Sequence, residues 1–486
     1  MIAAVILAAH FSSFDAFRQP IVTDIRYYLY FAARVARGDV PHRDYFDIKM
    51  QLASFAGALL FRTGEALGLD PLYVIRIGYL ILAGLVGMLI FATFRRLSGL
   101  DGAGIAGVLA YTGFGLLGVL PSIGNIPKML VVVFAYLAAF LALRRRWFLA
   151  GLAGVAAFCD WQIGGIVWLG VAAASVMERD RWRALGLAVL GGAAGMAAVM
   201  LYFGLNGALG AAISQALVAA HARGAASFAR ETFVDRCTRI GRLVDSTGAG
   251  RLWLIGCGSL GMCIVPAWVW RERGSERRRL IVPLAVYHGT IVLFSLLDFQ
   301  RFGDLFILLH SIAFFSGAAL AEGYARLHEF LARGALRPGG AAGLRRAIPI
   351  AALVALGLAV RPSFLRPPVR IGPRGLTLDD QRTVAASLRP LVAGKRLAFL
   401  GSTEQLFLLD ARNDVPINFW EAGARSYFVE AGESSQRALA RILRTSEADV
   451  LILPRGVDPG RRLHGDYRRI AIAAPSGRYK VILFAR

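Results

Sequence analysis

Acidic and basic side chains that could do chemistry occur in two places near the start of the chain. Asp24 comes first, and Arg43, Asp44, Asp47 and Lys49 follow together in the segment 43–49. A carboxylate can take a proton from an attacking hydroxyl, whereas arginine and lysine can offset the charge that grows on a departing phosphate. Residues of these two kinds, held side by side, can therefore combine acid–base chemistry with phosphate binding.

The same residues also have a structural interpretation. Thr23 and Asp24 stand just before an amphipathic stretch, 25–37, and both residue types are favoured N-caps of helices. The stretch places its arginines on one helical face, which is typical of a helix lying flat on a membrane surface. The two later aspartates are close in sequence to an arginine and a lysine, so a solvated loop of ion pairs also accounts for them.

The elements that must position these residues are those of a membrane protein. Of the 486 residues, 56% are hydrophobic and only 18% are charged, whereas soluble domains carry charge on about a quarter of their residues. The apolar residues come in blocks of about 17–25, which can cross a bilayer core of about 30 Å as helices. The net charge of +23 lies largely in arginines of short loops, so it indicates cytoplasmic loops and no nucleic-acid partner.

The apolar blocks predict a polytopic helical bundle of about eleven spans, because five arginine clusters then fall on the cytoplasmic side. This places the first outer loop, 15–70, on the outer face. The run 147–177 is short for two crossings and long for one. The predicted spans are 1–14, 71–94, 102–120, 127–143, 147–160, 164–177, 184–205, 252–270, 280–297, 305–321 and 347–360.

After residue 361 the pattern changes, which predicts a transmembrane module over 1–361 and a small α/β domain over 362–486 on the outer face. Helices are expected at 376–392, 403–409 and 434–443. Buried strands are expected at 396–400, 450–453 and 479–484. The four cysteines have no paired spacing and indicate neither a disulfide framework nor a zinc site.

The first outer loop resembles that of the GT-C superfamily of membrane glycosyltransferases, the group of the protein mannosyltransferases and the lipid A aminoarabinose transferase. Members carry an acidic residue before an amphipathic helix, and then a stretch that leads to a lysine. The matching positions in this chain are Asp24, Gly38, Pro41, Arg43, Asp44, Asp47 and Lys49. The match is most specific over 20–76.

The chain departs from the family pattern at several positions. Ile25 stands where many relatives have a second acidic residue, and His42 stands in place of a tyrosine. Lys128 occupies the acidic position of the second outer loop, while Asp160 occurs where relatives have lysine. An exchange of charge between Lys128 and Asp160 would keep a pair.

The resemblance implies roles for nine residues. Asp24 would be the general base or would orient the acceptor, and one carboxylate suffices for direct displacement with inversion. Arg301, Lys49 and Arg43 would bind the donor phosphate, although Arg301 also fits an ion pair with Asp298 or Asp304. The residues expected to shape the loop or bind substrate are Asp44, Asp47, Arg76, Lys128 and Asp160. No metal ligand and no cofactor are assigned, and a divalent metal is left open.

The expected function is therefore that of a glycosyltransferase in a bacterial inner membrane. It would move a sugar from a polyprenyl-phosphate donor to a glycan, lipid or protein acceptor at the outer, periplasmic face. Two alternatives stay open: an accessory protein that binds lipid-linked sugar without catalysis, and a transporter or flippase. Charges gather at helix ends and no internal repeat is visible, which weighs against a transporter.

Overall fold

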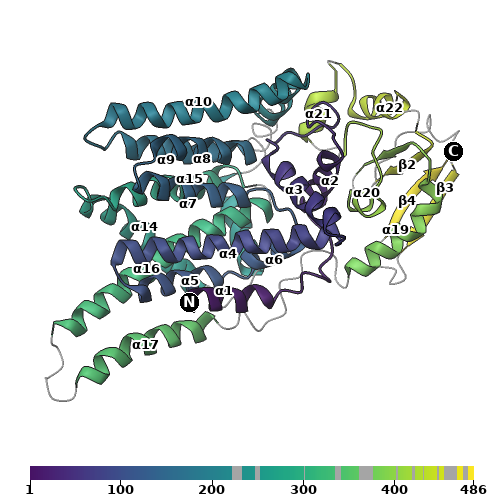
Figure 1. Cartoon of the computed structure of the whole chain (residues 1–486). Coiled ribbons are helices and arrows are strands. Elements are labelled where there is room, and N and C mark those ends of the chain that lie inside the picture. Colours follow the sequence, from purple (N-terminus) through teal and green to yellow (C-terminus); the bar gives the residue numbers. More distant parts are fainter. Residues whose placement is uncertain are drawn as a thin grey trace.

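The computed structural model consists mostly of helices, with one small sheet near the C-terminus (Figure 1). It describes residues 1–221, 232–246, 252–299, 302–333, 341–360, 376–400, 403–418, 422–430, 432–445, 448–453, 468–473 and 480–485. Within these residues, five helices are long and apolar enough to cross a membrane, or six if one bent pair forms a single span.

The first half of the chain is entirely helical. Its elements are α1 (Ile2–Ser12), α2 (Ile25–Ala36), α3 (Leu52–Ala66), α4 (Pro71–Ser98), α5 (Asp101–Thr112), α6 (Leu116–Ile123), α7 (Met129–Leu143), α8 (Trp147–Asp160), η1 (Gln162–Gly164), α9 (Gly165–Ser175), α10 (Arg181–Leu205), α11 (Leu209–Ile213) and the π-helical turn η2 (Ser214–Ala219).

The second half adds further helices and then the strands. Its elements are α13 (Phe233–Ser246), α14 (Leu252–Arg271), α15 (Arg278–Leu297), α16 (Phe302–Ala332), α17 (Ala341–Val360), α19 (Leu378–Val392), β1 (Leu397–Phe399), α20 (Glu404–Leu409), α21 (Ala422–Phe428), α22 (Ser435–Thr445), β2 (Val450–Leu453), β3 (Arg468–Ala473) and β4 (Lys480–Ala485).

Each predicted span coincides with a helix or a pair of helices, but the count of eleven spans stays a prediction. The block 102–120 forms two helices, α5 and α6, bent by 64°. The run 147–177 forms α8 and α9, both shorter than a full crossing and joined by η1. Six apolar helices in the described residues have only 10–17 residues.

Small residues let the bundle helices pack closely. A Cβ atom at Gly261 of α14 would overlap the backbone carbonyl of Phe315 in α16. The same close approach joins α8 to α10, where Gly151 faces the carbonyl of Ala188. Glycine at such positions lets two helix backbones approach closely. Membrane helices favour this packing because the hydrophobic effect does not drive helices together within lipid.

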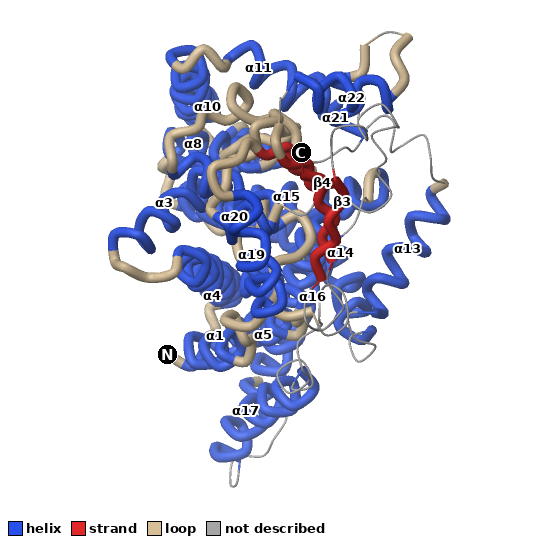
Figure 2. Tube along the Cα trace, turned by 90° about the vertical axis from the view of Figure 1, so that its right-hand side faces the viewer, coloured by secondary structure: helices blue, strands red, loops and turns tan. Residues whose placement is uncertain are grey.

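The C-terminal strands of the described residues form one mixed sheet of order β1-β2-β4-β3, which faces the viewer in front of the bundle helices in Figure 2. β1 and β2 are parallel, with Leu397 opposite Val450, and the other pairs are antiparallel. The predicted strands at 396–400, 450–453 and 479–484 correspond to β1, β2 and β4, whereas the sequence did not predict β3 or α21. The proposed domain boundary at 361 lies outside the described residues.

The helices of the segment 15–70, α2 and α3, lie between the bundle and the sheet (Figure 1). Gln381 of α19 exchanges two hydrogen bonds with the backbone of Ile21, at 2.7 and 2.8 Å. The backbone N–H of Asn413 donates to the hydroxyl of Tyr30 in α2 at 2.8 Å. The start of α2, where the candidate site lies, is therefore fixed by residues from the far end of the chain.

Candidate active site

Asp24 stands immediately before α2 and does not cap it. Its backbone is in the right-handed helical region, and its side chain makes no capping hydrogen bond to the helix. The preceding Thr23 has a φ of 60°, a conformation that costs a β-branched residue strain and that occurs mainly at functional sites. The capping interpretation therefore does not account for the carboxylate, whose side chain is 60% exposed.

Lys49 is the nearest cation to this carboxylate among the ion pairs of the described residues. Its Nζ lies 4.0 Å from Oδ2 of Asp24, and it also lies 5.4 Å from the centre of the Tyr28 ring. The lysine side chain is only 17% exposed, so its charge is screened less than that of a surface lysine. Asp24 and Lys49, which the sequence predicted as base and cation, therefore lie next to each other.

Asp47 lies beneath this lysine and fixes the loop that carries it. One carboxylate oxygen accepts from the backbone N–H of Lys49 at 3.2 Å, and the other accepts from the amide of Gln51 at 2.9 Å. The carboxyl is buried, and burial raises its pKa to about 6, against the opposing effects of Gln51 and the Lys49 charge. Asp47 therefore acts on the site through Lys49.

This raised pKa has a measurable consequence for stability. The native state binds the Asp47 proton more tightly than the unfolded chain does. The free energy of unfolding that this carboxyl contributes is therefore fully present below about pH 4 and is lost as pH rises through about 6. The loss amounts to about 3 kcal/mol at 1.36 kcal/mol per unit. We expect Asp47→Asn to remove it, so the melting temperature of the variant should fall less than that of the wild type between pH 4.5 and 7.5. Parallel profiles would contradict this expectation, and the exposed Asp15→Asn serves as the control.

Lys128 is the second buried cation of the site. It precedes α7 with a φ of 80°, its side chain forms an ion pair with Asp304 of α16, and its Nζ lies 4.1 Å from the centre of the Trp161 ring. The hypothesis of a side-chain pair between Lys128 and Asp160 is therefore replaced by a pair with Asp304. Asp160 instead accepts the backbone N–H groups of Lys128 and Val131, at 3.0 and 3.2 Å, and so holds the start of α7.

The start of α16 brings these parts together. A Cβ atom built on Gly303 would lie 3.4 Å from Nζ of Lys128 and 3.9 Å from Oδ2 of Asp24. The carboxylate before α2, the lysine before α7 and the first turn of α16 therefore surround one small space. Arg301, predicted to bind the donor phosphate, lies outside the described residues.

The structure places Arg43 apart from Asp24. Arg43 is half-exposed and pairs with its neighbour Asp44 at 2.9 Å, and it donates to the backbone carbonyl of Asn206 at 3.1 Å. Asp44 in turn accepts the N–H of Val40 at 2.7 Å. The hydrogen bond from Arg43 lowers the pKa of Asp44. These contacts fit a role in shaping the loop, while phosphate binding by Arg43 stays a prediction.

Arg76 is fully buried and holds three backbone segments together. Its guanidinium donates to the carbonyls of Ala16, Gln19 and Ile123, at 2.5, 2.8 and 2.7 Å. Of its two expected roles, loop shaping and substrate binding, these contacts favour the first. They join α4 to the segment that leads into Thr23 and Asp24.

Arg76→Leu is accordingly expected to lower the free energy of unfolding by about 3 kcal/mol or more, because three buried carbonyls would lose their donors. Thermal unfolding in detergent would measure the effect. The matched control is Arg95→Leu in the same helix, whose ion pair with Asp101 is exposed and should contribute no more than about 1 kcal/mol. Equal shifts in the two variants would show that the Arg76 contacts are unimportant.

Two glutamines support the loop, and the sequence did not single them out. Gln215 of η2 accepts from the backbone N–H of Asp47 at 3.2 Å and contacts both the ring and the carbonyl of His42. Gln162 donates to the carbonyl of Ile48 at 2.8 Å. Burial lowers the pKa of His42 to about 4, so its ring is neutral at pH 7. Both glutamines could have been noticed in the sequence, because each is a polar residue at the start of an apolar helical stretch or within one.

Comparison with solved structures finds this arrangement of helices in known proteins. ArnT from Cupriavidus metallidurans bound to undecaprenyl phosphate is similar at a TM-score of 0.60 and 14% identity, over 99% of this chain and 96% of that one. AglB from Archaeoglobus fulgidus, an oligosaccharyltransferase in complex with an inhibitory peptide and a dolichol-phosphate, is similar at 0.53 and 13%, over 93% and 68%. No family model and no curated protein matches the chain.

The likeness extends over nearly the whole chain and shows that this multi-pass membrane protein has the GT-C fold. The fold implied by the resemblance of the first outer loop is thereby confirmed. At 13–14% identity the likeness concerns the fold, and the activity has to be argued from the site.

Proposed function

We propose that the protein is a glycosyltransferase that moves a sugar from a polyprenyl-phosphate donor to an acceptor at the outer face of a bacterial inner membrane. The observation that carries the proposal is the meeting of Asp24, Lys49 and Lys128 around the first turn of α16. A carboxylate, the cation of Lys49 and the ion pair of Lys128 with Asp304 converge there, within a fold whose known members include proteins bound to polyprenyl phosphates.

The residues suggest one displacement step. The acceptor hydroxyl attacks the anomeric carbon while Asp24 takes its proton, and the bond from that carbon to the phosphate oxygen breaks with its electron pair on the leaving group. Lys49 stabilises the charge that develops there, an effect enlarged where water is sparse. A single displacement inverts the anomeric carbon, and one carboxylate suffices for it.

Lys128 takes part through its ion pair with Asp304. The pair is buried and nearly neutral as a whole, so it fixes the geometry around Gly303 without adding a second strong cation. Holding α7 and α16 together in advance reduces the reorganisation needed during the reaction. Lys128 is thus a positioning residue, and Arg301 is proposed as a further partner of the donor phosphate.

The topology is part of the same proposal. The chain would cross the membrane about eleven times, with 15–70 and the C-terminal domain, 362–486, on the outer side. The support is the distribution of arginine in the sequence and the contact of α19 and the sheet region with the first outer loop. A cysteine-accessibility scan at the outer loops, with a reagent that does not cross membranes, tests this orientation.

The activity test uses the purified chain in nanodiscs with radiolabelled undecaprenyl-phosphate sugars and a cell-envelope extract as the acceptor. Transfer of label to the extract, with release of undecaprenyl phosphate, is the expected result. Saturable donor binding without any release would instead favour an accessory protein that binds lipid-linked sugar. Movement of intact donor between leaflets, followed by a fluorescent analogue, would favour a flippase.

A further inference from the structure

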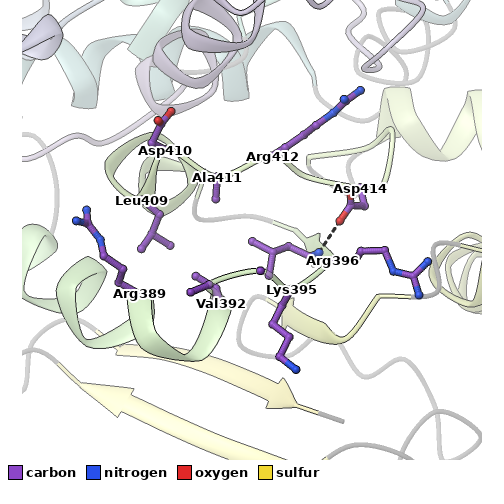
Figure 3. Close-up of a pocket in the computed structure, with 12 residues that line it drawn as sticks. Arg389, Val392, Lys395, Arg396, Leu409, Asp410, Ala411, Arg412 and Asp414 are labelled. Atoms are coloured by element: carbon purple, nitrogen blue, oxygen red, sulfur yellow. Dashed lines mark hydrogen bonds between the residues drawn. The ribbon is translucent and has the colours of Figure 1, made fainter.

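A cavity of about 750 Å³ lies at the edge of the C-terminal sheet, away from the site around Asp24. Figure 3 shows the end of α19 and the turn after it on one side, and the segment 409–414 on the other. The first side contributes Arg389 and Lys395, and the second contributes Arg412. Its volume falls in the range of small-molecule sites.

Cationic side chains dominate the polar part of this cavity. Arg389, Lys395, Arg396 and Arg412 line it, against two acidic residues, and the ends of the Lys395 and Arg412 side chains point away from its middle in Figure 3. Both carboxylates have other partners. Asp410 pairs with Arg37 at 2.7 Å, and Asp414 accepts the backbone N–H of Leu397 at 2.6 Å.

Two of the cations form no ion pair with any residue that the structure describes. Within the described residues, neither Arg389 nor Lys395 forms an ion pair, and both residues are exposed. Arg412 shares the Asp39 carboxylate at 3.5 Å and is still 64% exposed. Exposed side chains of this length reorient rapidly, so all three can turn toward an anion in the cavity. The unbalanced charge favours an anionic ligand.

The interior is not suited to a bare ion. Val392, Ala393, Leu397, Leu409 and Ala411 form an apolar part of the lining, and the cavity is much larger than a single phosphate requires. A ligand that fills it therefore has an organic body beside its charge. A phosphorylated sugar or polyol meets both demands, because its C–H faces pack on apolar groups and its phosphate accepts charge-assisted hydrogen bonds.

We propose that this cavity binds the phosphate of a phosphorylated sugar or polyol, as a site separate from the one around Asp24. The phosphate comes either from a free sugar phosphate or from the polyol headgroup of a membrane lipid. The cavity wall is joined to the end of α2 by the ion pairs Arg37–Asp410 and Asp39–Arg412. Since α2 begins next to Asp24, the same helix connects the two sites.

Titration calorimetry on the full chain in phosphatidylcholine nanodiscs tests the proposal, with glucose 6-phosphate as the probe. We expect saturable binding that weakens with added salt. The double variant Arg389→Ala/Lys395→Ala should raise the Kd by about tenfold or more. The control Arg437→Ala/Arg444→Ala removes the same charge from α22, outside the cavity, and should leave the Kd within about twofold.

Two further experiments show where the phosphate comes from and whether the ligand needs an organic part beside its phosphate. Phosphatidylglycerol in the nanodisc weakens binding of glucose 6-phosphate if the lipid headgroup is the ligand, and leaves it unchanged if the ligand comes from solution. Inorganic phosphate should bind about tenfold more weakly than glucose 6-phosphate. Absence of saturable binding, equal losses in the cavity and control variants, or equal affinity for inorganic phosphate would each overturn the proposal.

Discussion

Replacing Asp24 with asparagine is expected to lower turnover by about 100-fold or more while donor binding and thermal stability stay close to those of the wild type. Asparagine keeps the size of the side chain and removes its ability to take a proton. Because the carboxylate makes no capping hydrogen bond to α2 and its side chain is 60% exposed, we expect the substitution to change the melting temperature only slightly. The rate of release of undecaprenyl phosphate in single-turnover experiments measures the effect.

A matched carboxylate separates catalysis from a general loss of charge. Glu65 of α3 is about as exposed, at 48%, and pairs with Arg37 on the surface at 3.4 Å. Glu65→Gln should change turnover by no more than about twofold. If Asp24→Asn retained full activity, or if both variants lost it equally, Asp24 would not be the base.

The second large effect is expected at the buried ion pair. Lys128→Met leaves the Asp304 carboxylate buried without its lysine, and breaking a buried pair in this way costs about 3–5 kcal/mol of stability. Both side chains are nearly inaccessible, at 5% and 7%, so water cannot replace the lost partner. The melting temperature of the purified protein in nanodiscs should fall clearly.

The double variant Lys128→Met/Asp304→Leu distinguishes stability from function. Replacing both charges with apolar groups of similar size is often neutral for stability, so the melting temperature should recover toward that of the wild type. Turnover should stay reduced by about tenfold or more, since the preorganised charges near Gly303 are then absent. A double variant that regains full activity would make the pair purely structural.

The bundle could be predicted from the sequence because its signal is local. The block 184–205 becomes α10 (Arg181–Leu205), and the predicted and observed helix from Trp147 to Asp160 agree at both ends. Apolar composition over a span-length window suffices for such predictions. The bend between α5 and α6 coincides with Gly113 and Gly115, which weaken a helix, but glycine occurs throughout the apolar blocks and did not mark this break.

The site was predictable only where its residues are close in sequence. Asp24 and Lys49 belong to one loop, and the structure joins them. Lys128 was expected to pair with Asp160, 32 residues on, whereas its partner Asp304 is 176 residues away. Such a pairing is fixed by how α7 and α16 pack, and periodicity along the chain carries no information about it.

The contact between Gln381 and Ile21 has a consequence for biogenesis. These residues are 360 positions apart, so more than three quarters of the 486-residue chain must be synthesised before the backbone just ahead of Thr23 receives its partner. The segment that carries Asp24 is therefore completed late, although it is synthesised among the first. In a nascent chain that ends before α19, the backbone at Ile21 lacks both hydrogen bonds, so we expect the position of Asp24 to become fixed only after the C-terminal part has been made.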